Sequence, residues 1–257
     1  MKAQPLSLET CQIENTSFLP GEEITYEVYY NLNFVWFKAA KVVFTVSDLG
    51  DEFHIMAKGK TYKSYDWLFK VDDTFESYIS KESLYPRKAV RDIKEGKYRL
   101  YDRVEFDQEN YKATVLRGKS RAELGEELVF DLNGCMHDIL SLMYYVRNLP
   151  VQKMKKGDTF GVQLFLDKEV YPLRVSYKGL EESKKVKKLG KYNAHLFMPE
   201  TIEGSVFKKG DKMKIWVSDD NNRIPLLIDS PINVGSVKVV LKDYKNLRYG
   251  PVLSVDK

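Results

Sequence analysis

Residues 24–30 read ITYEVYY. In this stretch Ile24, Tyr26, Val28 and Tyr30 alternate with Thr25, Glu27 and Tyr29. A period of two is typical of a β-strand with one buried face. Similar short runs, separated by turn residues, recur at roughly eight- to twelve-residue spacing, as in an antiparallel meander. Further strands are predicted at 42–46, 53–59, 73–79, 98–106, 111–116, 159–166, 170–177, 192–197, 212–218, 224–228 and 236–241.

One segment has helical spacing instead. Pro150 follows it closely and is expected to end the helix. We therefore predict a mainly β fold with one main helix at about 135–148, covering one face of the sheet. The apolar residues that carry this spacing are Met136, Ile139, Leu140, Met143 and Val146.

The composition indicates a folded protein. Of the 257 residues, 43% are hydrophobic, which is enough for a full core. No stretch looks like a linker, so we predict a single β-rich domain at 18–257 after an N-terminal extension at 1–17. Lys and Arg number 41 against 37 Asp and Glu, and a net charge of +4 is too small to indicate nucleic-acid binding. No run approaches the roughly 18 apolar residues of a transmembrane helix.

The sequence indicates neither a metal nor an organic cofactor. The three histidines do not lie at zinc-ligand spacing with Cys11 and Cys135. The sequence has neither GxGxxG nor GxxxxGK[ST], so a dinucleotide or triphosphate cofactor is not expected. The two cysteines are either buried free thiols or the partners of one long-range disulfide.

Two aromatic patches are candidates for a ligand site. Tyr30 and Trp36 belong to the first patch, and Tyr65 and Trp67 belong to the second. In a curved sheet these rings either line a cavity for an apolar ligand or fill the core.

Polar residues of the predicted helix are a second candidate. Asp138, Ser141 and Tyr145 are spaced by three and four residues and share one face, and Arg147 lies near the helix end. They form either a polar cluster directed into a cleft or a polar stripe in which Ser141 faces solvent. No residue is predicted to be catalytic, since His137 and Asp138 diverge as neighbours on a helix and a GxSxG motif is missing.

Four motifs follow one another along the chain: GEEITY at 21–26, YDWLFKVDD at 65–73, DILS at 138–141 before YY and R at 144, 145 and 147, and WVSDD at 216–220 before RIP at 223–225. In this order they resemble the bacterial domain-of-unknown-function 3108 family, over about residues 18–241. The resemblance implies a strongly curved antiparallel sheet or half-open barrel. It also implies export to the periplasm or envelope with the signal peptide removed, and a Cys11–Cys135 disulfide, and it carries over no catalytic residues.

Three functions remain open. The leading hypothesis is a binding or carrier protein that holds an apolar or lipid-like ligand between the curved sheet and the helix. The first alternative is a structural or assembly protein of the envelope, which would contact its partner through an exposed apolar patch. The second is an enzyme acting on a glycan, with Asp138, Asp219 or Asp220 as acid and base, which requires two carboxyl groups about 5–10 Å apart in one cleft.

Overall fold

The computed structural model describes residues 12–32, 35–65, 70–187, 189–201, 212–233 and 235–255. Strands dominate and form one antiparallel sheet, which confirms the predicted mainly β class. The first half contains β1 (Glu23–Leu32), β2 (Val35–Leu49), β3 (Glu52–Thr61), β4 (Asp72–Ser80), β5 (Pro86–Glu95), β6 (Tyr98–Asp107), β7 (Lys112–Ser120), β8 (Glu123–Leu124) and β9 (Leu128–Asp131). The second half contains β10 (Thr159–Leu166), β11 (Glu169–Val186), β12 (Gly190–Pro199), β13 (Lys214–Ser218), β14 (Pro225–Pro231) and β15 (Ser236–Lys245).

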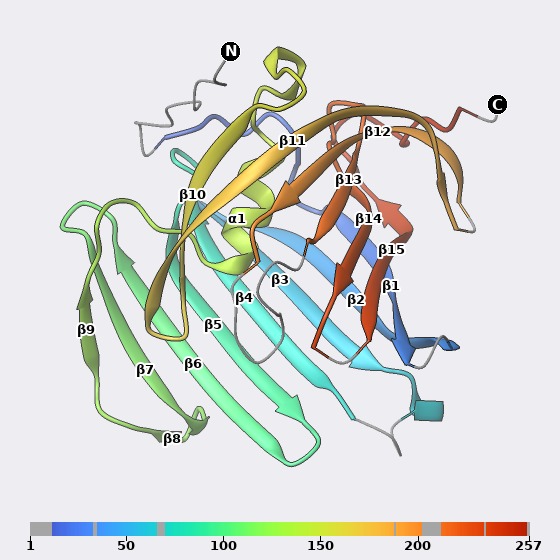
Figure 1. The fold of residues 1–257 in the computed structure, drawn as a ribbon. Helices are drawn as coiled ribbons and strands as arrows, with labels where there is room; N and C mark the ends of the chain where they lie inside the picture. Colours follow the sequence, from blue (N-terminus) through green and yellow to red (C-terminus); the bar gives the residue numbers. More distant parts are fainter. Residues whose placement is uncertain are drawn as a thin grey trace.

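The first and last strands meet in the middle of the sheet. On β1, Val28 lies opposite Ala40 of β2 and Val239 of β15. From this centre the sheet continues through β2 to β8 on one side and back through β14 to β10 on the other. Among the described residues no strand pairing joins β8 or β9 to β10, and Figure 1 shows the sheet curled around the helix as a half-open barrel. The predicted curvature is therefore confirmed.

The alternation pattern does not reveal β5, which pairs with β4 and β6. Its sequence, PRKAVRDIKE, begins with proline and contains several charged residues, although Val90 and Ile93 are buried. Two strands are also longer than predicted, because β2 already begins at Val35 and β11 continues to Val186. Hydrogen bonds to neighbouring strands satisfy the backbone groups of these segments, and local sequence patterns do not report such pairing.

The helix is shorter than the predicted 135–148. It comprises α1 (Ile139–Val146) and begins after Asp138, whose Oδ1 accepts hydrogen bonds from the backbone N–H groups of Leu140 (2.7 Å) and Ser141 (3.3 Å). The Ser141 hydroxyl accepts a return bond from the Asp138 N–H at 3.0 Å and completes a capping box. Directly before the cap, His137 is bridged to Leu164 of β10 in extended conformation. These contacts prevent the helix from starting at Cys135.

Three hydrophobic clusters fill the interior. The largest packs α1 against β3, β4 and β10 to β12, and Leu140 and Tyr144 are among its buried residues. A second lies between β1 and β12 to β15 around Trp216 and Leu226, and a third lies beneath β5 to β7 around Val115 and Phe165. Because α1 contacts β3, β4 and β10, it connects the two halves of the curved sheet.

Ion pairs connect the two halves near the open edge. Asp167, in the turn between β10 and β11, bonds to Arg91 at 2.7 Å and to Arg117 at 3.1 Å. Both arginines also bond to the buried Asp102 on β6. Burial alone would raise the pKa of Asp102, but the hydrogen bonds and charges of Arg117 and Arg91 outweigh it and hold that pKa below its usual value. The turn is thereby tied to β5, β6 and β7.

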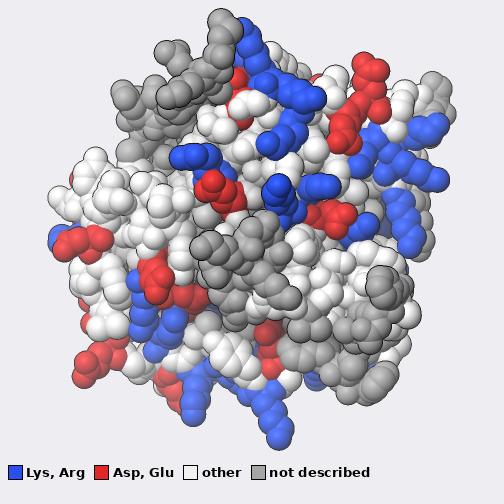
Figure 2. Space-filling model, in the orientation of Figure 1, with Lys and Arg blue, Asp and Glu red and all other residues white. Residues whose placement is uncertain are grey.

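On the face drawn in Figure 2, basic and acidic side chains lie intermingled. A surface of mixed sign creates no single long-range field toward a polyanion. Within the described ranges, no helix combines the length and the apolar character needed to cross a bilayer.

Candidate functional site

A cavity of about 600 Å³ lies between α1 and the concave face of β10 to β15. Its wall is almost entirely apolar, because alternate residues of each strand point to the same side of the sheet. The strand residues at the wall include Val162, Leu164 and Leu166 of β10, Leu173 and Val175 of β11, Phe197 of β12, Ile215 and Val217 of β13, Ile228 and Ser230 of β14, and Val237 and Val239 of β15.

The helix is apolar on two faces. Leu140, Tyr144 and Tyr145 are buried against the main core. The other face presents Ile139, Leu142, Met143 and Val146, which line the cavity and are only partly buried. Their spacing of three, four and seven residues places them on one stripe. Leu142, Met143 and Val146 also pack against the main core, so the second stripe lies partly on protein and partly beside a space large enough for a small molecule.

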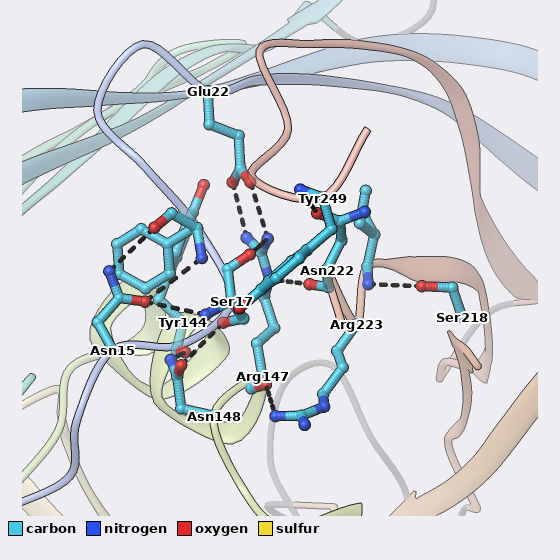
Figure 3. Close-up of polar contacts among 12 residues, drawn as sticks. Asn15, Ser17, Glu22, Tyr144, Arg147, Asn148, Ser218, Asn222, Arg223 and Tyr249 are labelled. Carbon is cyan, nitrogen blue, oxygen red and sulfur yellow. Dashed lines mark hydrogen bonds and ion pairs between the residues drawn. The ribbon is translucent and has the colours of Figure 1, made fainter. Parts of the chain in front are cut away.

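A buried ion pair fixes the C-terminal end of α1 (Figure 3). The Arg147 guanidinium donates to both carboxylate oxygens of Glu22, at 2.7 and 2.8 Å, and its Nε donates to the Asn222 carbonyl at 3.1 Å. Burial alone would lower the pKa of Arg147, but the charge and hydrogen bonds of Glu22, together with smaller effects of Tyr144 and Tyr26, outweigh it and raise that pKa above its usual value. Arg147 lines the cavity, but all three of its guanidinium nitrogens already bond to the protein, since Nη2 also reaches the Ser17 carbonyl at 3.4 Å.

Arg223 lies beside this ion pair and also lines the cavity. Its Nη1 donates to the Arg147 carbonyl at 3.0 Å, and its Nη2 donates to the Gln152 side chain at 3.3 Å. Its Nε is buried and has no hydrogen-bond partner among the described residues. Burial lowers the pKa of Arg223 because desolvation disfavours the charged form.

The N-terminal end of α1 carries a second, smaller polar cluster. Ser77 of β4 donates to Asp138 Oδ2 at 2.5 Å, and the ring nitrogen Nδ1 of His137 lies 3.2 Å from the Ser141 hydroxyl. Burial raises the pKa of Asp138 and lowers that of His137 to about 3. The alternative in which Ser141 faces solvent is wrong, because Ser141 is fully buried. Tyr145 is buried behind this cluster, with its ring 4.5 Å from that of His137.

Of the aromatic candidates, the structure describes the side chains of Tyr30 and Trp36, and these lie on opposite faces of the sheet. Tyr30 lies opposite Val237 across β1 and β15 and shares the inner face of the sheet with that residue, but it is not part of the described cavity wall. Trp36 lies on the outer face, 40% exposed, with the Lys238 ammonium 4.8 Å from its ring centre. Tyr65 belongs to a short 3-10 helix, η1 (Lys63–Tyr65), and Trp67 lies outside the described residues.

The acidic candidates serve different parts of the fold. Asp138 caps α1 against β4, whereas Asp219 Oδ1 contacts His195 Nε2 at 2.8 Å beside β12. Asp220 Oδ1 accepts the backbone N–H groups of Asn222 and Arg223 in the turn between β13 and β14. A group of three or more His, Cys, Asp or Glu side chains able to hold a metal ion does not occur in the part of the chain that the structure describes.

Sequence reasoning missed two residues of this region. Glu22 lies two and four residues before the buried Ile24 and Tyr26, so the alternation placed it on the inner face, where a carboxylate requires a partner. Arg223 had no comparable signal, because a turn residue between two strands is usually exposed. Of the predicted site residues, only Arg147 lies in the described cavity wall.

Cys135 precedes α1 and is not a free thiol. Cys11 lies outside the described residues, so the Cys11–Cys135 bridge stays a prediction.

Comparisons with known proteins support this fold. A β-barrel-like protein from Brucella abortus, of the domain-of-unknown-function 1849 family, superposes with a TM-score of 0.60 at 11% identity, covering 90% of this chain and 99% of its own. A Bacteroides fragilis protein with a YmcC-like fold, proposed to be exported, reaches a TM-score of only 0.31 at 9% identity, covering 91% and 99%. No curated protein matches the sequence. The model of the protein family of unknown function DUF3108 matches residues 25–242, and the chain therefore belongs to that family.

Proposed function

We propose that the protein is a non-catalytic binding or carrier protein for an apolar or lipid-like ligand. The observation that carries the proposal is the cavity of about 600 Å³ between α1 and β10 to β15. Small-molecule sites are typically clefts of roughly 300–1,000 Å³ with mostly apolar walls and a few polar groups. The cavity has this size and this composition, and each methylene group transferred into it from water contributes about 0.8 kcal/mol.

The two apolar stripes of α1 add to this support. A helix at a protein surface normally turns one polar face to water. Here both faces are apolar, and the second stripe is only partly buried by protein. An apolar ligand in the cavity would remove that stripe from water.

Filling part of the cavity with a larger side chain should weaken binding. Leu173 lines the cavity, and its neighbour Arg174 is exposed on the other face of β11. We expect Leu173→Trp to weaken binding of the neutral apolar dye Nile red by roughly 10- to 100-fold, because the indole occupies ligand space. Arg174→Trp is the matched control and should bind normally. Equal binding by both variants would place the dye elsewhere, and native mass spectrometry with organic extraction of the unmodified protein would show whether a natural ligand co-purifies.

We further propose that the protein is exported and contains a Cys11–Cys135 disulfide. The support is that Cys135 is not a free thiol and that disulfides persist mainly in exported proteins. Closing so long a loop would stabilise the fold by about 3–5 kcal/mol in the loop-entropy picture.

Thiol labelling tests the bridge. Unreduced, denatured protein should take up no alkylating reagent, whereas reduced protein should take up two equivalents in its intact mass. Two labelled cysteines without reduction would contradict the proposed disulfide.

A further inference from the structure

The cavity wall contains one arginine that forms no ion pair with a described residue, although the charge of Asp220 acts on it from the same turn. Three charged residues lie in its described wall: Arg147, Glu200 and Arg223. Arg147 is neutralised by Glu22, and Glu200 is exposed at the end of β12. Arg223 bonds only to a backbone carbonyl and to the neutral Gln152 amide, and no ion pair to it is found within the described ranges.

The backbone holds this arginine in place. Arg223 has a φ of 49°, a left-handed conformation that is uncommon for a residue with a side chain. The turn is held by Asp220, whose Oδ1 accepts the Arg223 N–H at 3.0 Å. Strained backbone conformations of this kind persist where surrounding bonds impose them, and they cluster at ligand sites. Figure 3 shows the side chain extending from this turn toward the end of α1.

A guanidinium in these surroundings favours an anion. Its Nε–H is a buried donor without a described acceptor, and most buried donors in proteins are bonded. Arg223 is partly buried, and partial loss of water around a charge favours a partner of opposite sign. The planar fork of arginine matches carboxylate and phosphate oxygens. The apolar wall and an arginine without an ion pair together resemble a site for a molecule with an apolar chain and an anionic end.

We propose that the ligand is a single-chain amphiphile with an anionic headgroup, its chain among the apolar side chains of β10 to β15 and α1 and its headgroup on Arg223. This inference rests on the proposed binding function and specifies the chemistry of the ligand. Carboxylate and phosphate headgroups share the chemistry that Arg223 recognises.

The test compares ligands that differ only in their headgroup. Laurate, dodecyl phosphate, 1-dodecanol and dodecyltrimethylammonium have the same twelve-carbon chain, and each is used to displace Nile red from the full chain. We expect the two anions to bind roughly 10- to 100-fold more tightly than the alcohol, which corresponds to hydrogen bonds with a charged group. The tighter of the two anions identifies the headgroup. Equal or tighter binding of the alcohol or the ammonium compound would overturn the proposal.

Variants locate the effect at one residue. In Arg223→Gln the preference for laurate over 1-dodecanol should disappear while the affinity for the alcohol changes less than about twofold. Arg223→Lys should retain part of the preference because it keeps the charge, and Arg174→Gln, outside the cavity, should retain all of it. An unchanged preference in Arg223→Gln would overturn the proposal. If Arg223→Gln fails to fold, the affinities of the unmodified protein and of Arg223→Lys for laurate and 1-dodecanol test the proposal instead.

The outcomes distinguish the proposed anionic headgroup from the proposed binding function. If neither Nile red nor any of the four ligands binds, the proposed binding function fails, and this inference fails with it. If the ligands bind without regard to headgroup charge, the binding function stands and only the anionic headgroup is wrong.

Discussion

Replacing Glu22 with Gln should lower the free energy of unfolding by about 3–5 kcal/mol, the cost expected when one partner of a buried ion pair is removed. The side chains of Arg147 and Glu22 are 4% and 0% exposed, so the remaining arginine would stay buried without its counter-charge. For a protein of this size the melting temperature should fall by roughly 6–20 °C. Urea denaturation and thermal melting followed by circular dichroism measure both quantities.

The expected loss of stability is large also because Arg147 connects three segments of the chain. It bonds to Glu22 before β1, to the Ser17 carbonyl and to the Asn222 carbonyl between β13 and β14. Its guanidinium also lies 4.9 Å from the centre of the Tyr144 ring, a cation–π distance. The ion pair therefore positions the end of α1 at the edge of the cavity.

The adjacent residue provides the control. Glu23 pairs with Lys245, but these side chains are 37% and 61% exposed, and solvent screens most of the attraction in such a pair. Glu23→Gln should therefore be nearly neutral. A double variant, Glu22→Gln with Arg147→Met, should be more stable than the sum of its single variants predicts, because no unpaired charge remains. Similar stabilities of Glu22→Gln and Glu23→Gln would contradict the structural role of this pair.

Shortening a side chain on one apolar face of α1 should mainly reduce stability, and shortening one on the other face should mainly reduce ligand binding. Leu140 is 3% exposed and packs in the main core, so Leu140→Ala should cost about 2–5 kcal/mol. Leu142 lines the cavity and is only partly buried, so Leu142→Ala should cost no more than about 1 kcal/mol. Both values come from urea denaturation of the ligand-free protein.

Binding should show the reverse order. Leu142→Ala removes part of the cavity wall and should weaken Nile red binding by about 3- to 30-fold, since a residue of this size contributes one to a few methylene contacts. A folded fraction of Leu140→Ala should bind nearly as well as the unmodified protein. Equal losses of stability in the two variants would show that α1 is packed on both sides.

The sequence predicted much of the fold and less of the site. Alternation in residues 24–30 and the recurring turns predicted an antiparallel sheet, and the spacing around Ile139 and Val146 predicted the helix. The predicted start of the helix was wrong by four residues because Asp138 and Ser141 form a capping box, a contact between side chain and backbone that apolar spacing does not report. For Tyr30, the alternation showed which residues share its face of the strand, but it did not show which residues of other strands lie beside it.

Local pattern by itself determined which side chains share a face, because the periods of strands and helices are properties of the backbone. It therefore determined the mainly β class and the presence of the helix that follows Asp138. Only the tertiary structure decided what each inward face meets. Glu22 meets Arg147 across 125 positions of sequence, and the stripe of Leu142 and Val146 meets a cavity as well as the main core. Pairing and packing between distant segments depend on the curvature of the whole sheet, and that curvature places Arg223 at the wall of the cavity.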